Sequence, residues 1–132
     1  MEVKENVLSD PNLVTHEHYT TYLTEKGKGW VVETDNAIVG FAIIDTTTQN
    51  IWALFVLPGY EGKGIGKMLQ SAMLNWYFSE HKNTLWLSTS PGTRAEQFYL
   101  KTGWKAVGKT QSNEIKFEMT YPVWETTKNK YQ

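Results

Sequence analysis

The feature that most constrains this sequence is a loop with three alternating glycines, Gly62-Lys63-Gly64-Ile65-Gly66, between two apolar segments. The segment before it, residues 51–57, has no polar face and predicts a central strand. The segment after it, residues 67–81, places its apolar residues on one helical stripe. Glycines at such a junction let main-chain N–H groups converge, and the start of the helix adds more of them. The loop is therefore predicted to bind an anion such as pyrophosphate.

The spacing of this loop excludes two other glycine-rich phosphate loops. A Walker A loop needs a glycine where Glu61 stands and a serine or threonine where Met68 stands. A dinucleotide-binding fingerprint needs a third glycine at the position of Lys67. Neither pattern fits this chain.

The remaining segments alternate between strand and helix patterns. Asp35-Asn36 separates two strand-like runs and predicts a hairpin, and Thr93 is suited to cap a short helix. We expect strands over residues 30–34, 37–45, 51–57, 84–89, 104–108 and 114–121, and helices within 12–25, 67–81 and 94–101. The pattern predicts one α/β domain over residues 1–132, with an abbreviated helical segment at 1–29, which ends in a turn at 26–29, and a loose tail at 125–132.

Composition limits the classes of partner and site. With 132 residues, 40% of them hydrophobic, the chain can bury one core. A net charge of -1 disfavours nucleic acid as a partner. The absence of cysteine excludes disulfides, thiolate metal sites and cysteine nucleophiles, and no metal is expected. No apolar run is long enough for a membrane span, so we expect no membrane association and a cytoplasmic location.

Two segments resemble motifs of one enzyme family. Residues 56–67 resemble the acetyl-CoA signature of the GCN5-related N-acetyltransferase (GNAT) family, and residues 94–104 resemble its second segment. The resemblance covers roughly residues 30–120 and implies a GNAT-like α/β fold. That fold has a mixed, mostly antiparallel sheet with a splayed central strand and flanking helices. It also implies an enzyme that transfers an acetyl group from acetyl-CoA to a primary amine by direct attack in a ternary complex.

The same resemblance implies roles for individual residues. Tyr99 would be the catalytic general acid that protonates the departing sulfur of CoA. The remaining residues would bind the cofactor: Leu54, Phe55 and Val56 by main-chain groups along the pantetheine arm, and Glu61, Gly62, Lys63, Gly64, Ile65, Gly66 and Lys67 around the pyrophosphate.

Four positions depart from the family pattern. Glu61 stands where the family usually has Gln or Arg, and Gly92 stands where it has an asparagine that contacts the cofactor. Asn50 and Ser88 stand where some branches carry a glutamate base. These departures support an alternative, a non-catalytic module on the same fold that binds acyl-CoA or another protein. The sequence leaves open whether the acceptor is a small molecule or a protein, and whether the chain forms a homodimer.

Overall fold

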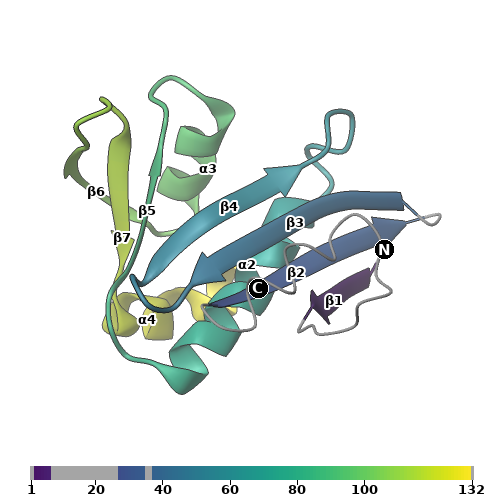
Figure 1. Cartoon of the computed structure of the whole chain (residues 1–132), viewed down its shortest axis with the longest axis horizontal. Helices are drawn as coiled ribbons and strands as arrows, with labels where there is room; N and C mark the ends of the chain where they lie inside the picture. The colour runs from purple at the N-terminus through teal and green to yellow at the C-terminus, as the bar shows by residue number, and fades with distance from the viewer. Residues whose placement is uncertain (1, 7–26, 35–36, 132) are drawn as a thin grey trace.

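Seven strands of the described residues form one sheet in the order β1-β2-β3-β4-β5-β7-β6 (Figure 1). The structure is a computed structural model that describes residues 2–6, 27–34 and 37–131. The elements are β1 Glu2–Asn6, β2 Gly27–Thr34, β3 Ala37–Asp45, β4 Asn50–Val56, α2 Ile65–Glu80, β5 Leu85–Thr89, α3 Arg94–Lys101, β6 Lys105–Lys109, β7 Ile115–Met119 and α4 Tyr121–Tyr131. Neighbouring strands run antiparallel except β4 and β5, which are parallel. The expected mixed and mostly antiparallel sheet with flanking helices is confirmed.

The sheet opens between β4 and β5, as expected for a splayed central strand. The register joins these strands at one pair, Asn50 with Trp86, beyond which they diverge (Figure 1). The amide Nδ2 of Asn50 donates to the Trp86 carbonyl oxygen at 3.2 Å, and the Trp86 indole donates to the Thr48 carbonyl oxygen at 3.0 Å. Next to this junction β4 has an extra residue, Trp52, because Ile51 and Ala53 pair with consecutive residues of β3. Such a bulge bends a strand, which fits the divergence of β4 from β5.

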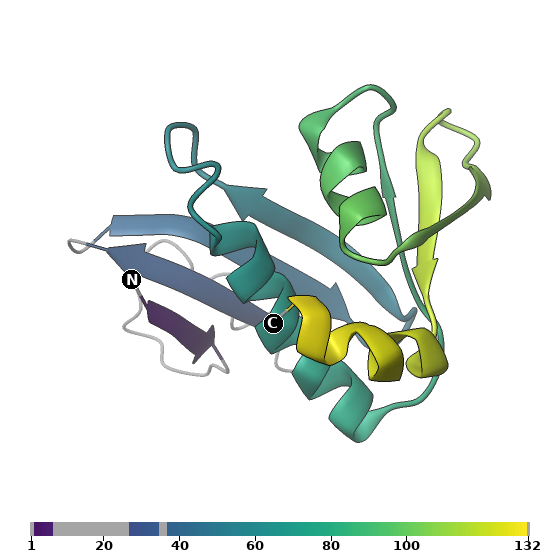
Figure 2. The same cartoon turned by 180° about the vertical axis from the view of Figure 1, so that it is seen from behind.

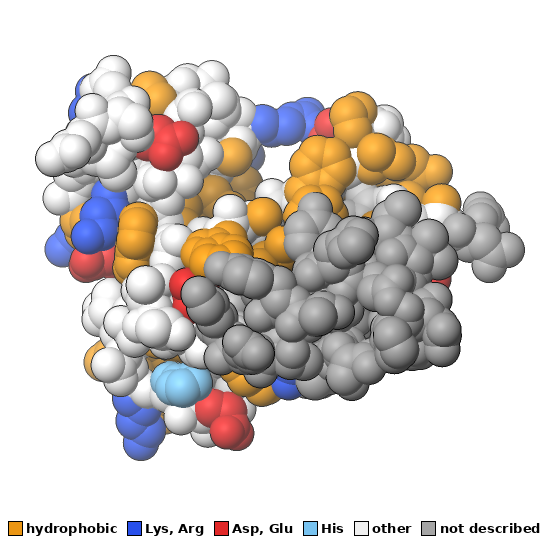
Figure 3. All heavy atoms as spheres, in the orientation of Figure 1, with side chains coloured by type: hydrophobic (Ala, Val, Ile, Leu, Met, Phe, Trp, Pro, Cys, Tyr) orange, Lys and Arg blue, Asp and Glu red, His pale blue; other side chains and the backbone are white. Residues whose placement is uncertain are grey.

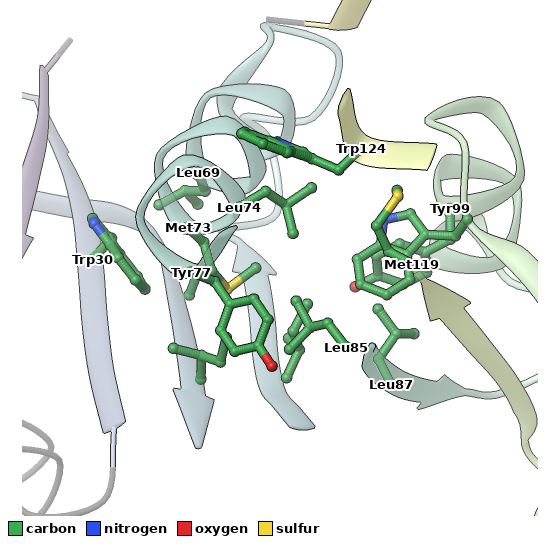
Figure 4. Packing of buried hydrophobic residues seen from close by; sticks show 14 of the residues in the cluster. Trp30, Leu69, Met73, Leu74, Tyr77, Leu85, Leu87, Tyr99, Met119 and Trp124 are labelled. Atoms are coloured by element: carbon green, nitrogen blue, oxygen red, sulfur yellow. The ribbon is translucent and has the colours of Figure 1, made fainter. Parts of the chain in front are cut away.

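Helices α2 and α4 lie across one face of the sheet, behind it in Figure 1 and in front in Figure 2. Leu69, Met73 and Tyr77 recur at helical spacing on α2 and are fully buried against the sheet (Figure 4). A Cβ at Gly40 of β3 would lie 2.9 Å from Ile65 Cγ2, so a glycine there lets α2 approach the sheet closely. None of the helices in the described ranges is long and apolar enough to span a bilayer.

The C-terminal segment differs from the loose tail predicted for residues 125–132, because α4 continues through Tyr131. Trp124 stacks on Phe78 of α2 with ring centroids 5.3 Å apart, and Tyr121 meets the same ring at 5.9 Å. The helix can start here because these aromatic residues, which precede the predicted tail, gain a partner once α2 is in place.

The N-terminal region also differs from the prediction where it is described. Residues 2–6 form β1, and Gly27–Gly29, predicted as a turn, belong to β2. A Cβ at Gly27 would lie 1.8 Å from the Ile44 carbonyl oxygen, so this glycine permits close strand pairing and is not a turn signal. The helix predicted within residues 12–25 and the connection Asp35-Asn36 lie outside the described residues.

Candidate functional site

The glycine loop connects the open end of β4 to α2 and has left-handed main-chain angles. Gly62 has φ of 78° and Gly64 has φ of 83°, and no heavy atom lies within 4 Å of the place where a Cβ would stand on either. Gly64 is the N-cap of α2, and no side chain caps the helix. The first helical hydrogen bond runs from the Met68 N–H to the Gly64 carbonyl oxygen, so the N–H groups before Met68 have no helical acceptor. This arrangement offers an uncapped helix N-terminus to an anion.

The side chains of the loop divide between solvent and core. Lys63 and Lys67 are exposed, whereas Ile65, the first residue of α2, is buried against β3. A Cβ on Gly66 would lie 3.4 Å from the ring of Phe98, so Gly66 is packed against α3. A ligand at this loop can therefore meet the main chain of Ile65 and Gly66 and the charged ends of the two lysines.

The carboxylate of Glu61 is turned back onto its own loop. Its Oε1 accepts a 2.9 Å hydrogen bond from the Gly59 N–H. Hydrogen bonds from the main chain of Glu61 itself and of Gly59 lower the pKa of Glu61 below its ordinary value, and Arg94 acts in the same direction. Arg94 is a residue that the sequence patterns did not single out, because only the fold brings the start of α3 toward this loop. Glu61 therefore stays ionised, with its carboxylate held by the main chain of its own loop.

The edge of β4 that faces the opening includes Leu54, Phe55 and Val56. Past Asn50 this edge has no partner strand in the register with β5, so its peptide groups on that side remain available. Leu54 and Val56 pack their side chains against the core, while Phe55 points to the other face and is 42% exposed. The exposed edge suits an extended ligand that carries amide groups.

Tyr99 lies on α3 behind the opening, within the core (Figure 4). Its ring contacts those of Phe98, Trp104 and Phe117 at centroid distances of 5.4, 5.8 and 5.8 Å. Burial raises the pKa of Tyr99 well above its ordinary value. The phenol therefore stays protonated at neutral pH and can donate a proton or a hydrogen bond but cannot act as a base.

Gly92 occupies a turn that fits glycine. Its φ is 75°, and its N–H donates to Glu96 Oε1 at 2.7 Å, while the Glu96 N–H donates to Thr93 Oγ1 at 3.2 Å. These bonds cap α3 and engage the N–H of Gly92.

A carboxylate that the sequence patterns did not predict, that of Glu114, lies beside Ser88. Asn50 is engaged with the main chain of β5, but the Ser88 hydroxyl donates a 2.8 Å hydrogen bond to Oε1 of Glu114. Glu114 is 26 residues from Ser88 in the sequence and reaches it through the pairing of β5 with β7. No local motif marks it. Elsewhere in the described ranges, no three His, Cys, Asp or Glu side chains are grouped so that they could hold a metal ion.

The chain has relatives among known proteins. Residues 3–104 match the model of the acetyltransferase (GNAT) family. The chain is 32% identical over 75 residues to the ribosomal protein bS18-alanine N-acetyltransferase of Haemophilus influenzae, covering 55% of this chain and 51% of that protein. It is 36% identical over 92 residues to the peptidyl-lysine N-acetyltransferase YjaB of Salmonella typhimurium, covering 65% and 56%. The chain thus spans about half the length of these curated relatives.

Solved structures share the fold. The IAA acetyltransferase from Bacillus cereus superposes with a TM-score of 0.67 at 15% identity, covering 90% of this chain and 99% of that one. A GNAT family acetyltransferase from Elizabethkingia anophelis, solved with acetyl-CoA bound, gives a TM-score of 0.67 at 13% identity, covering 89% and 97%. The family model spans most of the sequence and includes β4, the glycine loop and β5. The chain belongs to the GNAT family of acetyltransferases.

Proposed function

We propose that this chain is an acetyl-CoA-dependent N-acetyltransferase that transfers an acetyl group to a primary amine by direct attack in a ternary complex. The observation that carries the proposal is the divergence of β4 from β5 directly beside the glycine loop. Two matched relatives are named as N-acetyltransferases of a ribosomal-protein alanine and of peptidyl-lysine, and a neighbour in fold was solved with acetyl-CoA. Their names support amine acetylation here.

The residues present fit acetyl-CoA as the acyl donor. The free edge of β4 at Leu54–Val56 offers hydrogen bonds to the amides of the pantetheine arm. The uncapped N-terminus of α2, with Lys63 and Lys67, offers N–H groups and positive charge to the pyrophosphate. Acetyl-CoA supplies the thioester that the amine attacks.

Tyr99 would assist departure of the sulfur. The neutral amine nitrogen bonds to the thioester carbonyl carbon, the C–S bond breaks, and the sulfur receives the phenol proton of Tyr99. The nitrogen, which must lose a proton to become an amide, returns one to Tyr99. A thiol has a pKa near about 8.5, below that of a buried phenol, so full transfer of the proton from Tyr99 to the thiolate is uphill by itself. The phenol therefore acts by hydrogen bonding to the charge that develops on sulfur, and the proton moves only as the nitrogen returns one to Tyr99. The net products are an amide and free CoA thiol.

One observation favours the non-catalytic alternative. Gly92 has no side chain to contact the cofactor, and its N–H is already bonded to Glu96. A chain that binds acyl-CoA without turnover could tolerate the loss of this cofactor contact.

Two measurements on the intact chain separate these outcomes. We expect CoA to raise the midpoint of thermal unfolding by mass action on the folded state, and acetyl-CoA to be consumed when amines are added. A thermal shift without consumption over a broad panel of small amines and peptides would support the non-catalytic module. A midpoint of thermal unfolding that millimolar CoA leaves unchanged would exclude both functions.

A further inference from the structure

The Ser88–Glu114 pair lies on the face of the sheet opposite α2 and α4. Leu87 of β5 is 2% exposed and belongs to the core behind the sheet, so Ser88, the next residue, points to the other face. The Ser88 hydroxyl bonds the carboxylate of Glu114 at 2.8 Å there. Tyr99 belongs to the core on the helical side. The phenol and the carboxylate therefore stand on opposite faces of the opened sheet.

Glu114 is held in place by the turn between β6 and β7. Its N–H donates to Thr110 Oγ1 at 3.1 Å, and its carbonyl oxygen accepts from the Thr110 N–H at 2.8 Å. Asn113 adopts φ of 67°, in the left-handed region that asparagine tolerates, and donates its N–H to the Thr110 carbonyl oxygen. Main chain and side chain of Glu114 are thus both fixed, so its carboxylate is presented in one orientation.

Glu114 and Leu54 of β4 lie at similar distances along their strands from the Asn50–Trp86 pair, where the opening begins. Leu54 is four residues past the junction at Asn50, or about 13 Å along the strand. Ile115, the neighbour of Glu114, pairs with Thr89, which is three residues past Trp86, or about 10 Å. Glu114 therefore stands at about the height of the β4 segment that the proposed function assigns to the pantetheine arm.

The β4 wall on this face is apolar and aromatic. The rings of Phe41 and Phe55 are 5.3 Å apart, inclined at 31°, and Phe55 is 42% exposed. Leu57, just past the strand, is 38% exposed. In Figure 3 the surface is notched between the two lobes at the top of the view, and hydrophobic side chains gather beside the notch. Aromatic faces of this kind suit an aromatic or branched apolar group and also tolerate a nearby cation.

The wall opposite β4 is formed by β5 and β7, and its charges set the number of ammonium groups that it can hold. Phe117 of β7 is buried in the core, so Lys116 and Glu118 share the face of Glu114. The Lys116 ammonium lies 5.0 Å from the ring centroid of Trp86, on this same wall. Lys105 pairs with Glu118 across β6 and β7 and so shares this face. Two carboxylates and two ammonium groups balance, which leaves no excess of negative charge for an acceptor with more than one amine.

We infer that the acceptor is a small monoamine with an aromatic or branched apolar body, bound between Glu114 and the Phe41–Phe55 pair. This inference rests on the proposed function and adds its acceptor class. The ammonium of the acceptor pairs with Glu114 and transfers one proton to it, which leaves the neutral amine that attacks the thioester. Glu114 then releases that proton to solvent, so each turnover yields one amide, one thiol and one proton.

A panel of amines tests the acceptor class by consumption of acetyl-CoA. We expect kcat/KM to be at least 10-fold higher for 2-phenylethylamine and 2-cyclohexylethylamine than for ethylamine or spermidine. Equal or faster turnover of ethylamine or spermidine would overturn the inference and leave the proposed function intact. A chain that binds CoA but acetylates only peptides would overturn it too. Failure of the proposed function has a different signature, namely no turnover of any amine or peptide.

Variants with matched controls test the two walls. Phe55→Ala should lower kcat/KM for 2-phenylethylamine roughly 3- to 10-fold more than for ethylamine, the size of one aromatic contact, and any effect on acetyl-CoA binding should be common to both amines. Val107→Ala truncates an equally exposed apolar residue, 43% exposed on β6, and should change neither. Phe55→Leu, which keeps an apolar side chain, should have a smaller effect than Phe55→Ala and guards against loss of folding.

Glu114→Gln should lower kcat/KM for every amine by roughly 10²- to 10⁴-fold while the CoA-induced thermal shift persists. Glu125→Gln on exposed α4 removes the same charge and should have no effect. Wild-type selectivity in Phe55→Ala, or wild-type rates in Glu114→Gln, would overturn the assignment of these walls.

Discussion

The indole Nε1 of Trp104 donates a 3.0 Å hydrogen bond to Oε1 of Gln70, a side chain of α2 that is only 3% exposed. The Thr102 hydroxyl donates to the same oxygen at 3.3 Å. Trp104 and Thr102 also bond the carbonyl oxygen of Tyr99 through their main-chain N–H groups, at 3.1 and 3.3 Å. One buried amide therefore links α2, which begins at the glycine loop, to the end of α3, which carries Tyr99.

Gln70→Leu should lower the free energy of unfolding by about 1–3 kcal/mol, because the indole N–H of Trp104 would be left buried without an acceptor. Chemical denaturation checks this value. In the double variant Gln70→Leu with Trp104→Phe the donor is gone as well, so the combined loss should be smaller than the sum of the single losses. Strictly additive losses would show that the bond does not couple these two residues.

The sequence predicted elements whose signals are local. The β3 strand Ala37–Asp45 and the α3 helix Arg94–Lys101 begin and end where their patterns predicted, because β-branched runs, a Thr93 cap and a following glycine act within a few residues. The predicted glycine loop has the left-handed angles at Gly62 and Gly64 that explain its composition.

The features that the sequence could not predict depend on contacts between distant segments. α4 is held by Phe78, and β1 is defined by its pairing with β2. Glu114 becomes a candidate only through the hydrogen bond from Ser88. Hydrophobic periodicity carries no information on such partners, since each of these segments alone is short and polar. The roles assigned to Tyr99 and to the loop remain predictions.

Lys67→Glu should weaken CoA binding without unfolding the loop. A charge-assisted bond to phosphate contributes about 1.5–3 kcal/mol, so the dissociation constant should rise roughly 10- to 100-fold, and less at high salt. A glutamate in the first turn of α2 interacts favourably with the helix dipole, so stability should not fall.

Lys109→Glu on the edge strand β6 makes the same change of charge elsewhere and serves as the control. Calorimetry should show a normal affinity for Lys109→Glu, and a normal affinity for Lys67→Glu would argue against the loop as the phosphate site. Replacing Gly64 is a poorer test, because its φ of 83° strains any side chain.

Tyr99 should make the chain sensitive to alkali. Burial raises the pKa of Tyr99 in the folded chain, whereas an unfolded tyrosine ionises near about 10. The stabilising contribution is complete below that pH and is lost as pH rises from there toward the folded pKa. Relative to Tyr99→Phe, the parent should lose up to about 1.4 kcal/mol of unfolding free energy per pH unit above pH 10. Urea titrations at pH 9, 10 and 11 measure this difference. Parallel losses in parent and variant would indicate that the phenol is not buried in solution.

Tyr99→Phe should separate the chemistry of the hydroxyl from the packing of the ring. The ring stays among Phe98, Trp104 and Phe117, so stability at neutral pH and CoA affinity should be nearly unchanged. Loss of the proton donor should slow a single turnover by roughly 10²- to 10⁴-fold. Tyr77→Phe is the matched control, because Tyr77 is also fully buried and its hydroxyl has no hydrogen-bond partner, yet it lies on α2 away from the opening. Removing that hydroxyl should leave the rate unchanged. If both variants kept the parent rate within twofold, the sulfur would take its proton from solvent, and Tyr99 would be a core residue without a chemical role.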